Sequence, residues 1–182
     1  MIPPGMTEED TKTPYILDSA PLIDVKDHFP ELLRKLKKLV GDGLIKIPDS
    51  VLRELSDVAG KSDKATQWVQ SMKNQYQDFV VSFSGSDYVA HQIRQELSRI
   101  APKYGPHFTV GKQTYPGFWS SRAGRKAAEG KVIAVAKVLK GTVVSNEKTV
   151  RGACLLERVP CIGWEEFVRQ AEELIGGPLR LF

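Results

Sequence analysis

The sequence predicts an α/β fold built on a largely parallel sheet of four to five strands. Short apolar runs alternate with segments whose apolar residues recur at helical spacing, which is the pattern of strand–helix–strand units. The first run, Tyr15–Leu17, is apolar throughout, as is typical of a strand buried on both faces. At 182 residues, we expect a single domain over 13–176. Residues 1–12 and 177–182 would form flexible tails.

Composition narrows the class of protein. Hydrophobic residues make up 41% and charged residues 26% of the chain, as in soluble globular proteins. The net charge of +4 permits a nucleic-acid partner without showing one. Cys154 and Cys161 lack the spacing of a metal site, and buried free thiols fit a reducing cytoplasm. No stretch is apolar for long enough to span a bilayer, so we expect no membrane partner.

Capping residues and periodicity place the elements of the first half. After Asp18 we expect a turn into a short segment that reaches Asp24. Pro30 opens a helix that ends at Val40, and its basic outer face is interpreted as solvated rather than as an RNA contact. Strands should follow at 44–47 and 79–83, and helices should begin at Asp49 or Ser50, at Ser62, and at Ser86 or Asp87.

The stretch 101–121 interrupts this alternation. Its prolines and glycines predict an irregular insertion without helix or strand. It is also rich in aromatic residues, namely Tyr104, His107, Phe108, Tyr115, Phe118 and Trp119. Aromatic side chains among cations suit stacking on unpaired bases, but a loop can also pack a small core of its own. Both interpretations remain open. Beyond it we expect helices at 127–139, 149–159 and 164–174, with strands at 142–145 and 161–162.

Four acidic residues follow strands or open helices. Asp18 comes directly after the first strand, and Glu147 follows the strand at 142–145. Glu54 lies in the first turns of a helix, and Glu129 begins another. Because the carboxyl ends of parallel strands share one edge, these side chains can gather there. Clustered carboxylates repel one another unless a hard cation neutralises them, so the pattern predicts a site for Mg²⁺ or Mn²⁺.

Simpler interpretations exist for two of these acids. Asp18 can end a strand and cap the turn that follows, and Glu54 can be an exposed first-turn residue favoured by the helix dipole. Other chemistries lack support, because the sequence contains no Gly-rich phosphate loop and no G-x-S-x-G motif.

The acids lie in four short motifs that resemble those of the PIN domain, the metal-dependent ribonuclease fold of VapC-type toxins. The motifs are residues 15–19, 47–55, 128–136 and 141–148. Val159–Ile162 and the helix after it are similar to the end of an uncharacterised, toxin-like PIN subgroup. In that subgroup an aromatic insertion, like Tyr115–Trp119 here, precedes the third acid.

The resemblance implies a three-layer α/β/α fold and a toxin endoribonuclease that cleaves RNA phosphodiesters with metal-activated water. Mg²⁺ or Mn²⁺ would be held by Asp18, Glu54, Glu129 and Glu147. Supporting hydrogen bonds would come from Ser19, Ser145 and Asn146. RNA would be contacted by Arg122, Arg125, Lys126, Lys131, Tyr115 and Trp119. Implied partners are an RNA substrate, an antitoxin protein and a second copy of the chain.

The third motif departs from the family pattern. PIN domains usually carry Asp followed by Pro or a similar residue, whereas this chain has Glu129-Gly130. Glu can ligate Mg²⁺, but its extra methylene moves the carboxylate oxygens, and Mg²⁺ demands near-octahedral geometry. Two alternatives therefore stay open. One is a catalytically weakened module that binds RNA or protein, and the other is a DNA-directed, structure-specific nuclease.

Overall fold

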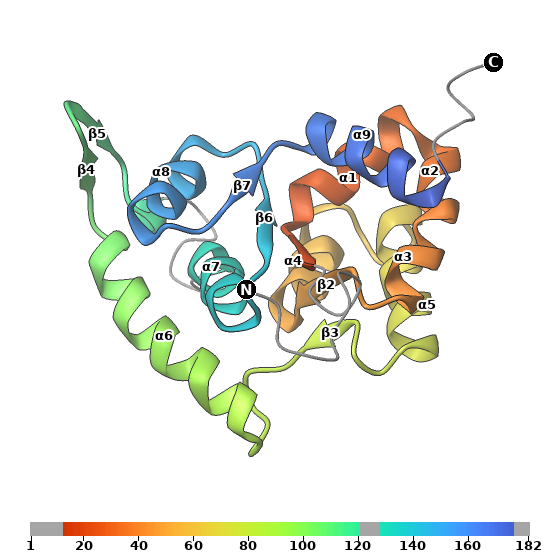
Figure 1. Ribbon diagram of the computed structural model, residues 1–182, viewed down its shortest axis with the longest axis horizontal. Helices are drawn as coiled ribbons and strands as arrows, with labels where there is room; N and C mark the ends of the chain where they lie inside the picture. Colours follow the sequence, from red (N-terminus) through yellow and green to blue (C-terminus); the bar gives the residue numbers. More distant parts are fainter. Residues whose placement is uncertain (1–12, 121–127, 177–182) are drawn as a thin grey trace, which may run out of the picture.

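The computed structural model describes residues 13–120 and 128–176, and a five-stranded parallel sheet forms its centre (Figure 1). The strand order is β3-β2-β1-β6-β7. The strands are β1 (Tyr15–Leu17), β2 (Ile45–Pro48), β3 (Val80–Val81), β6 (Thr142–Val144) and β7 (Cys161–Ile162). Tyr15 opposes Ile45 on one side and Thr142 on the other, and every pairing in this sheet is parallel. The predicted fold class is confirmed.

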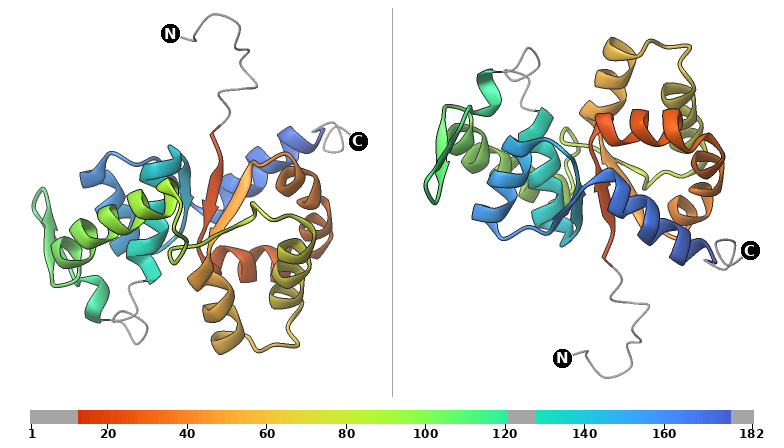
Figure 2. Two further views of the ribbon diagram at one scale, coloured as in Figure 1. Left: turned by 90° about the horizontal axis from the view of Figure 1, so that it is seen from below. Right: turned by 90° about the horizontal axis from the view of Figure 1, so that it is seen from above.

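Helices cover both faces of the sheet and complete three layers (Figure 2). One face carries α6 (Tyr88–Tyr104), α7 (Ala128–Leu139) and α8 (Lys148–Glu157). The other carries α1 (Ser19–His28), α2 (Pro30–Lys35), α3 (Lys37–Gly41), α5 (Lys64–Gln75) and α9 (Trp164–Ile175). The remaining helix, α4 (Asp49–Val58), contacts both α5 and α7. Across 13–120 and 128–176, no helix has the length and apolar character needed to cross a membrane.

The core forms where the apolar faces of the helices meet the central strands. Ile16 and Leu17 of β1 are fully buried, and burial of side chains of this size stabilises the fold by roughly 1.5–3 kcal/mol each. In helix α7 the five consecutive residues 132–136 are all buried, so the helix is covered on every side at this point. This is expected for a helix that lies between a sheet and other helices. Phe167 of α9 packs edge-on against Tyr15, with ring centroids 5.2 Å apart.

The segment after Asp18 is a helix, so the turn predicted there is wrong. Asp18 is the N-cap of α1, and its Oδ1 accepts a hydrogen bond from the backbone amide of Ser19 at 2.8 Å. Pro21 is compatible with the first turn, where a backbone N–H is not needed. Leu22 and Val25 are fully buried, so packing of this face favours the helix. The helix predicted from Pro30 to Val40 is present as α2 and α3, divided at Leu36.

Two predicted caps shift by one or two residues. Helix α4 starts after Pro48, and the Asp49 carboxylate accepts a hydrogen bond from the Phe83 amide at 3.3 Å instead of capping the helix. Helix α5 is capped by Asp63, one residue beyond the predicted Ser62. Asp87 caps α6 as predicted.

The stretch predicted to be irregular contains regular structure up to Ser120. Helix α6 continues through Pro102 to Tyr104, followed by the hairpin of β4 (Phe108–Val110) and β5 (Gln113–Tyr115) and a 3₁₀ helix at Phe118–Ser120. Gly111 takes a φ of +60° in the two-residue hairpin turn, a conformation that glycine adopts without strain. Tyr104, at the end of α6, is fully buried. Its burial favours continuation of the helix past Pro102. Figure 1 shows the hairpin standing apart from the sheet at one end of the molecule.

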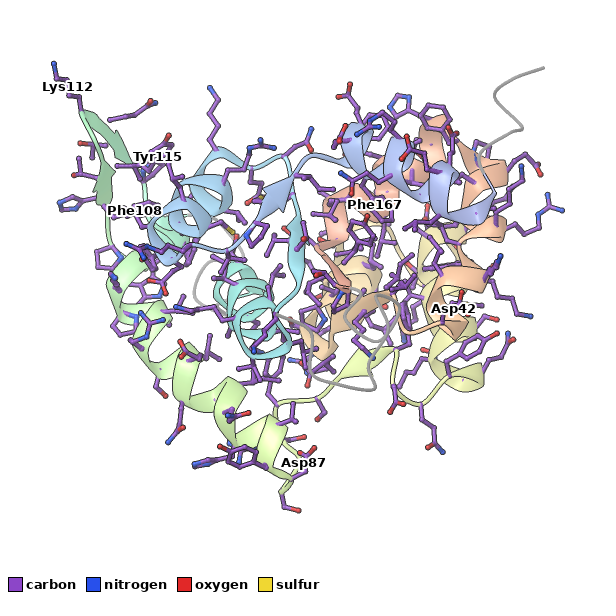
Figure 3. The ribbon with its side chains drawn as sticks, viewed as in Figure 1. Asp42, Asp87, Phe108, Lys112, Tyr115 and Phe167 are labelled. Atoms are coloured by element: carbon purple, nitrogen blue, oxygen red, sulfur yellow. The ribbon has the colours of Figure 1, made fainter. Side chains whose placement is uncertain are left out.

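Most aromatic side chains of this stretch pack on one another. Phe108 lies 5.1 Å from Tyr104 and 5.5 Å from Tyr115 between ring centroids, and Figure 3 shows Phe108 and Tyr115 at the base of the hairpin with Lys112 at its tip. Phe118 is 2% exposed. The packed-loop interpretation therefore holds for these residues. Trp119, at 47% exposure, remains accessible.

The predicted tails at 1–12 and 177–182, and Ser121 at the end of the insertion, lie outside the described residues. The proposed domain boundaries stay predictions.

Candidate acidic site

Asp18 lies buried at the carboxyl end of the central strand. Its backbone amide donates a hydrogen bond to the carbonyl of Val144 at 3.4 Å, which places it between the ends of β1 and β6. Its side chain is 4% exposed and also caps α1. The two interpretations offered for this residue are thus compatible, because one carboxylate oxygen caps the helix while the group faces other acids.

The other three acids come from three further elements. Glu54 lies in α4, Glu129 in the first turn of α7, and Glu147 is the N-cap of α8. The pKa of Asp18 is raised well above its ordinary value, chiefly by burial, then by repulsion from Glu54 and Glu147. The amide of Ser19 opposes this shift, and Glu129 adds to it. The carboxylates of Glu54, Glu129 and Glu147 therefore all lie within electrostatic reach of Asp18.

Glu54 and Glu147 have raised pKa values of their own. Burial is the main cause for Glu54, hydrogen bonding from the Ser19 side chain partly opposes it, and Glu129 and Asp57 add repulsion. Glu147 sits at the exposed rim, yet loss of surrounding water raises its pKa and Glu54 raises it further. The negative charge of the site is thus incompletely neutralised by its protein surroundings.

The three residues predicted to support the acids occupy different places. Ser19, 5% exposed, reaches Glu54 from the start of α1. Ser145, 1% exposed, accepts a hydrogen bond on Oγ from the Glu147 amide at 3.2 Å. Asn146 accepts a hydrogen bond on Oδ1 from the Trp164 amide at 2.8 Å, which ties the loop after β6 to the start of α9. Asn146 fixes the loop that carries Glu147.

The carboxylates of the four acids are chemically suitable ligands for a hard divalent cation, but the described side chains do not converge on one point. Carboxylate oxygens are the ligands that Mg²⁺ prefers. Among the described residues, Glu54 Oε2 is buried and receives no hydrogen bond. However, no three Asp, Glu, His or Cys side chains in the described ranges are grouped closely enough to hold a metal ion.

The residues predicted to contact RNA are only partly placed. The Lys131 ammonium lies 4.9 Å from the centroid of the Phe83 ring, in a cation–π contact. Tyr115 stacks on Phe108, whereas Trp119 is half exposed beside Gly105. The remaining three, Arg122, Arg125 and Lys126, lie outside the described residues.

Arg151 is a candidate that sequence reasoning missed. Its Nη1 donates a hydrogen bond to the carbonyl of Ser145 at 3.4 Å, and its side chain is exposed. Its amide bonds to the carbonyl of Glu147, one helical turn earlier. The spacing of four residues after the last acid, at the start of a predicted helix, could have identified it.

Solved structures with a similar arrangement include three complexes. VapBC2 from Rickettsia felis, bound to a DNA fragment from its promoter, is 17% identical over 82% of this chain and 98% of that one, with a TM-score of 0.45. DNA-bound VapBC from Salmonella typhimurium is 15% identical over 84% and 98%, with a TM-score of 0.47. FitAcB from Neisseria gonorrhoeae is 18% identical over 83% and 98%, with a TM-score of 0.45. Similarity at this level assigns no activity.

Among curated proteins, none matches the chain. A family model described as a domain of unknown function, DUF4411, matches residues 15–174. This family is PIN-like, so the resemblance drawn from the acidic motifs is confirmed, while the detail of the aromatic insertion stays a prediction. The chain therefore belongs to the DUF4411 family.

Proposed function

We propose that the protein is a PIN-type, metal-dependent endoribonuclease and the toxin of a toxin–antitoxin pair. The observation that carries the proposal is the environment of Asp18. It is buried at the end of the central strand, and repulsion from Glu54, Glu129 and Glu147 acts on it from three other elements. A buried carboxylate that faces other negative charges destabilises a fold unless a cation offsets the repulsion.

Each acid has a role in this proposal. Asp18, Glu54, Glu129 and Glu147 would together hold Mg²⁺ or Mn²⁺, which when bound activates water and stabilises charge on phosphate. Ser19 would orient Glu54, and Ser145 would fix the backbone of Glu147.

The cations and aromatic groups near the site would hold the RNA. Arg151 offers a guanidinium at the acidic edge, where a bidentate contact with a backbone phosphate is favourable. Lys131 and the half-exposed Trp119 would contribute charge and a stacking surface.

Cleavage of a mixed RNA pool tests this function. Wild type and Asp18→Asn are compared with Mg²⁺, with Mn²⁺ and with EDTA, and a single-stranded DNA pool is run in parallel. We expect wild type to cleave RNA only with a metal and Asp18→Asn to lose at least about 100-fold in rate. Asp42→Asn, which removes an exposed acid outside the site, should cleave as wild type does. Cleavage of DNA alone would favour the structure-specific nuclease.

A binding module is the second candidate, because no three acids converge as the side chains stand and Glu129 replaces the usual Asp. It predicts RNA or antitoxin binding without cleavage, and equal binding by wild type and Asp18→Asn. Filter binding of the same RNA pool in EDTA measures this.

A further inference from the structure

A small cavity lined by cations lies at the edge of the sheet opposite the acids. Its volume is about 240 Å³, and it is lined by Ala136, Lys137, Lys140, Gly141, Arg158, Val159 and Pro160. These residues end α7 and α8 and precede β6 and β7. Since the strands are parallel, the cavity faces their amino ends, whereas Asp18 and Glu147 follow their carboxyl ends.

The backbone at this cavity has an unusual feature. Lys140 has a φ of +56° and Arg158 a φ of +59°, and in the described ranges no other non-glycine residue has a positive φ. In both places the next amide donates a hydrogen bond to the carbonyl five residues earlier, from Gly141 to Ala136 at 2.8 Å and from Val159 to Cys154 at 2.9 Å. This is the helix ending in which glycine is usual, because a side chain strains the left-handed conformation.

Both strained positions carry a cation, and both cations line the same cavity. Among the described residues, neither Lys140 nor Arg158 has an ion pair. The third cation, Lys137, bonds to Glu157 Oε1 at 2.9 Å. The carboxylate of Glu157 also pairs with Arg99 and Lys103. Among the described residues that line the cavity or pair with its cations, positive charge therefore exceeds negative charge.

We propose that this cavity binds a phosphate group, either as free phosphate or as the phosphate of a nucleotide. Arg158 offers a planar fork of donors that matches a tetrahedral oxyanion, and Lys140 supplies a second charge. The volume is below the range of cavities that enclose drug-sized ligands, which suits a small anion or the end of a larger molecule. The proposal goes beyond the nuclease function and does not depend on it.

The C-terminal ends of α7 and α8 cannot attract an anion by themselves, so phosphate binding depends on the cationic side chains. Their carbonyl ends carry partial negative charge, which repels an anion. The attraction must therefore come from the Lys140 and Arg158 side chains. Glycine at these positions removes the charge and also relieves the backbone strain, so loss of binding can be separated from loss of folding.

Isothermal titration calorimetry with inorganic phosphate, at an ionic strength held constant with chloride, tests the proposal. Wild type should bind phosphate, Arg158→Gly should bind at least about tenfold more weakly, and Lys140→Gly/Arg158→Gly should not bind. The thermal midpoints of both variants without phosphate should equal or exceed that of wild type. Lys38→Gln, which removes an exposed cation from α3, is the charge-matched control and should bind as wild type does.

A parallel titration with adenosine 5′-monophosphate separates the two sources of phosphate. Tighter binding of the nucleotide than of phosphate indicates a nucleotide ligand, and equal binding indicates free phosphate. The proposal is overturned if wild type shows no titration beyond that of matched chloride. It is also overturned if the double glycine variant binds phosphate as tightly as wild type.

Discussion

The Tyr104 hydroxyl donates a hydrogen bond to the Glu157 carboxylate and so joins the last turn of α6 to the last turn of α8. The carboxylate of Glu157 is 2% exposed and also receives Arg99, Lys103 and Lys137. One buried acid thus holds three helices together on one face of the sheet. The contact explains why α6 continues past Pro102.

Removing this acid should destabilise the fold. Glu157→Gln leaves three cations without their shared partner, and we expect the free energy of unfolding to fall by about 3 kcal/mol at pH 7. Urea unfolding measures it. Glu96→Gln is a matched control, because Glu96 pairs with Arg99 in a partly exposed position and should cost less than about 1 kcal/mol.

The contribution of Glu157 should also depend on pH. Burial alone would raise its pKa, but hydrogen bonds from Arg99, Tyr104 and Lys137 outweigh burial and hold the pKa far below its usual range. Because the folded pKa lies below the unfolded value of about 4.3, the stabilisation is present above that pH and is lost as the pH falls. The difference in free energy of unfolding between wild type and Glu157→Gln should therefore shrink as the pH falls from about 5 to about 2. Over this range the carboxyl group becomes protonated in the unfolded chain.

Neutralising Asp18 should stabilise the protein while removing activity. Burial and repulsion raise its folded pKa, so stability falls as the pH rises above the unfolded value of about 3.9. In EDTA at pH 7, Asp18→Asn should raise the free energy of unfolding on the order of 1 kcal/mol, a typical single-substitution effect. Asn can keep the α1 cap. Mg²⁺ should raise the thermal midpoint of wild type but not of the variant. If Asp18→Asn were less stable than wild type, the inferred repulsion between Asp18 and the neighbouring acids would be contradicted.

Substitutions of Glu129 separate an active nuclease from a binding module. If Glu129 is a metal ligand, Glu129→Gln should lose Mg²⁺-dependent cleavage nearly as fully as Asp18→Asn. Glu129→Asp should keep or raise cleavage, since it restores the usual residue. An inert wild type together with an active Glu129→Asp would identify a degraded nuclease. Cleavage by Glu129→Gln at the wild-type rate would exclude Glu129 from the site.

Tyr115 and Trp119 should behave differently on truncation. Tyr115 stacks on Phe108 and lies against Gly152, so Tyr115→Ala should cost roughly 2 kcal/mol of stability. Trp119 is half exposed, so Trp119→Ala should cost less than Tyr115→Ala and should weaken RNA binding at least about threefold. Thermal unfolding and RNA filter binding measure the two effects. Equal stability loss with intact binding would make Trp119 a packing residue too.

Local pattern was enough to predict the framework and the members of the acidic group. The apolar run Tyr15–Leu17 and the alternation of strands and helices predict the parallel sheet, because periodicity and capping act over a few residues. The order of the four acids along this alternation also indicates that they share one edge, since parallel strands end there together.

Only the tertiary structure decided features that depend on residues distant in sequence. Tyr104 meets Glu157 across 53 positions, and this contact overrides the local signal of Pro102. The positions of the acid side chains are likewise set by four separate elements, which local pattern does not orient. Lys140 and Arg158 look like ordinary helix-end cations in the sequence. They share a cavity only because α7 and α8 end side by side, where packing of distant segments outweighs the local preference for glycine.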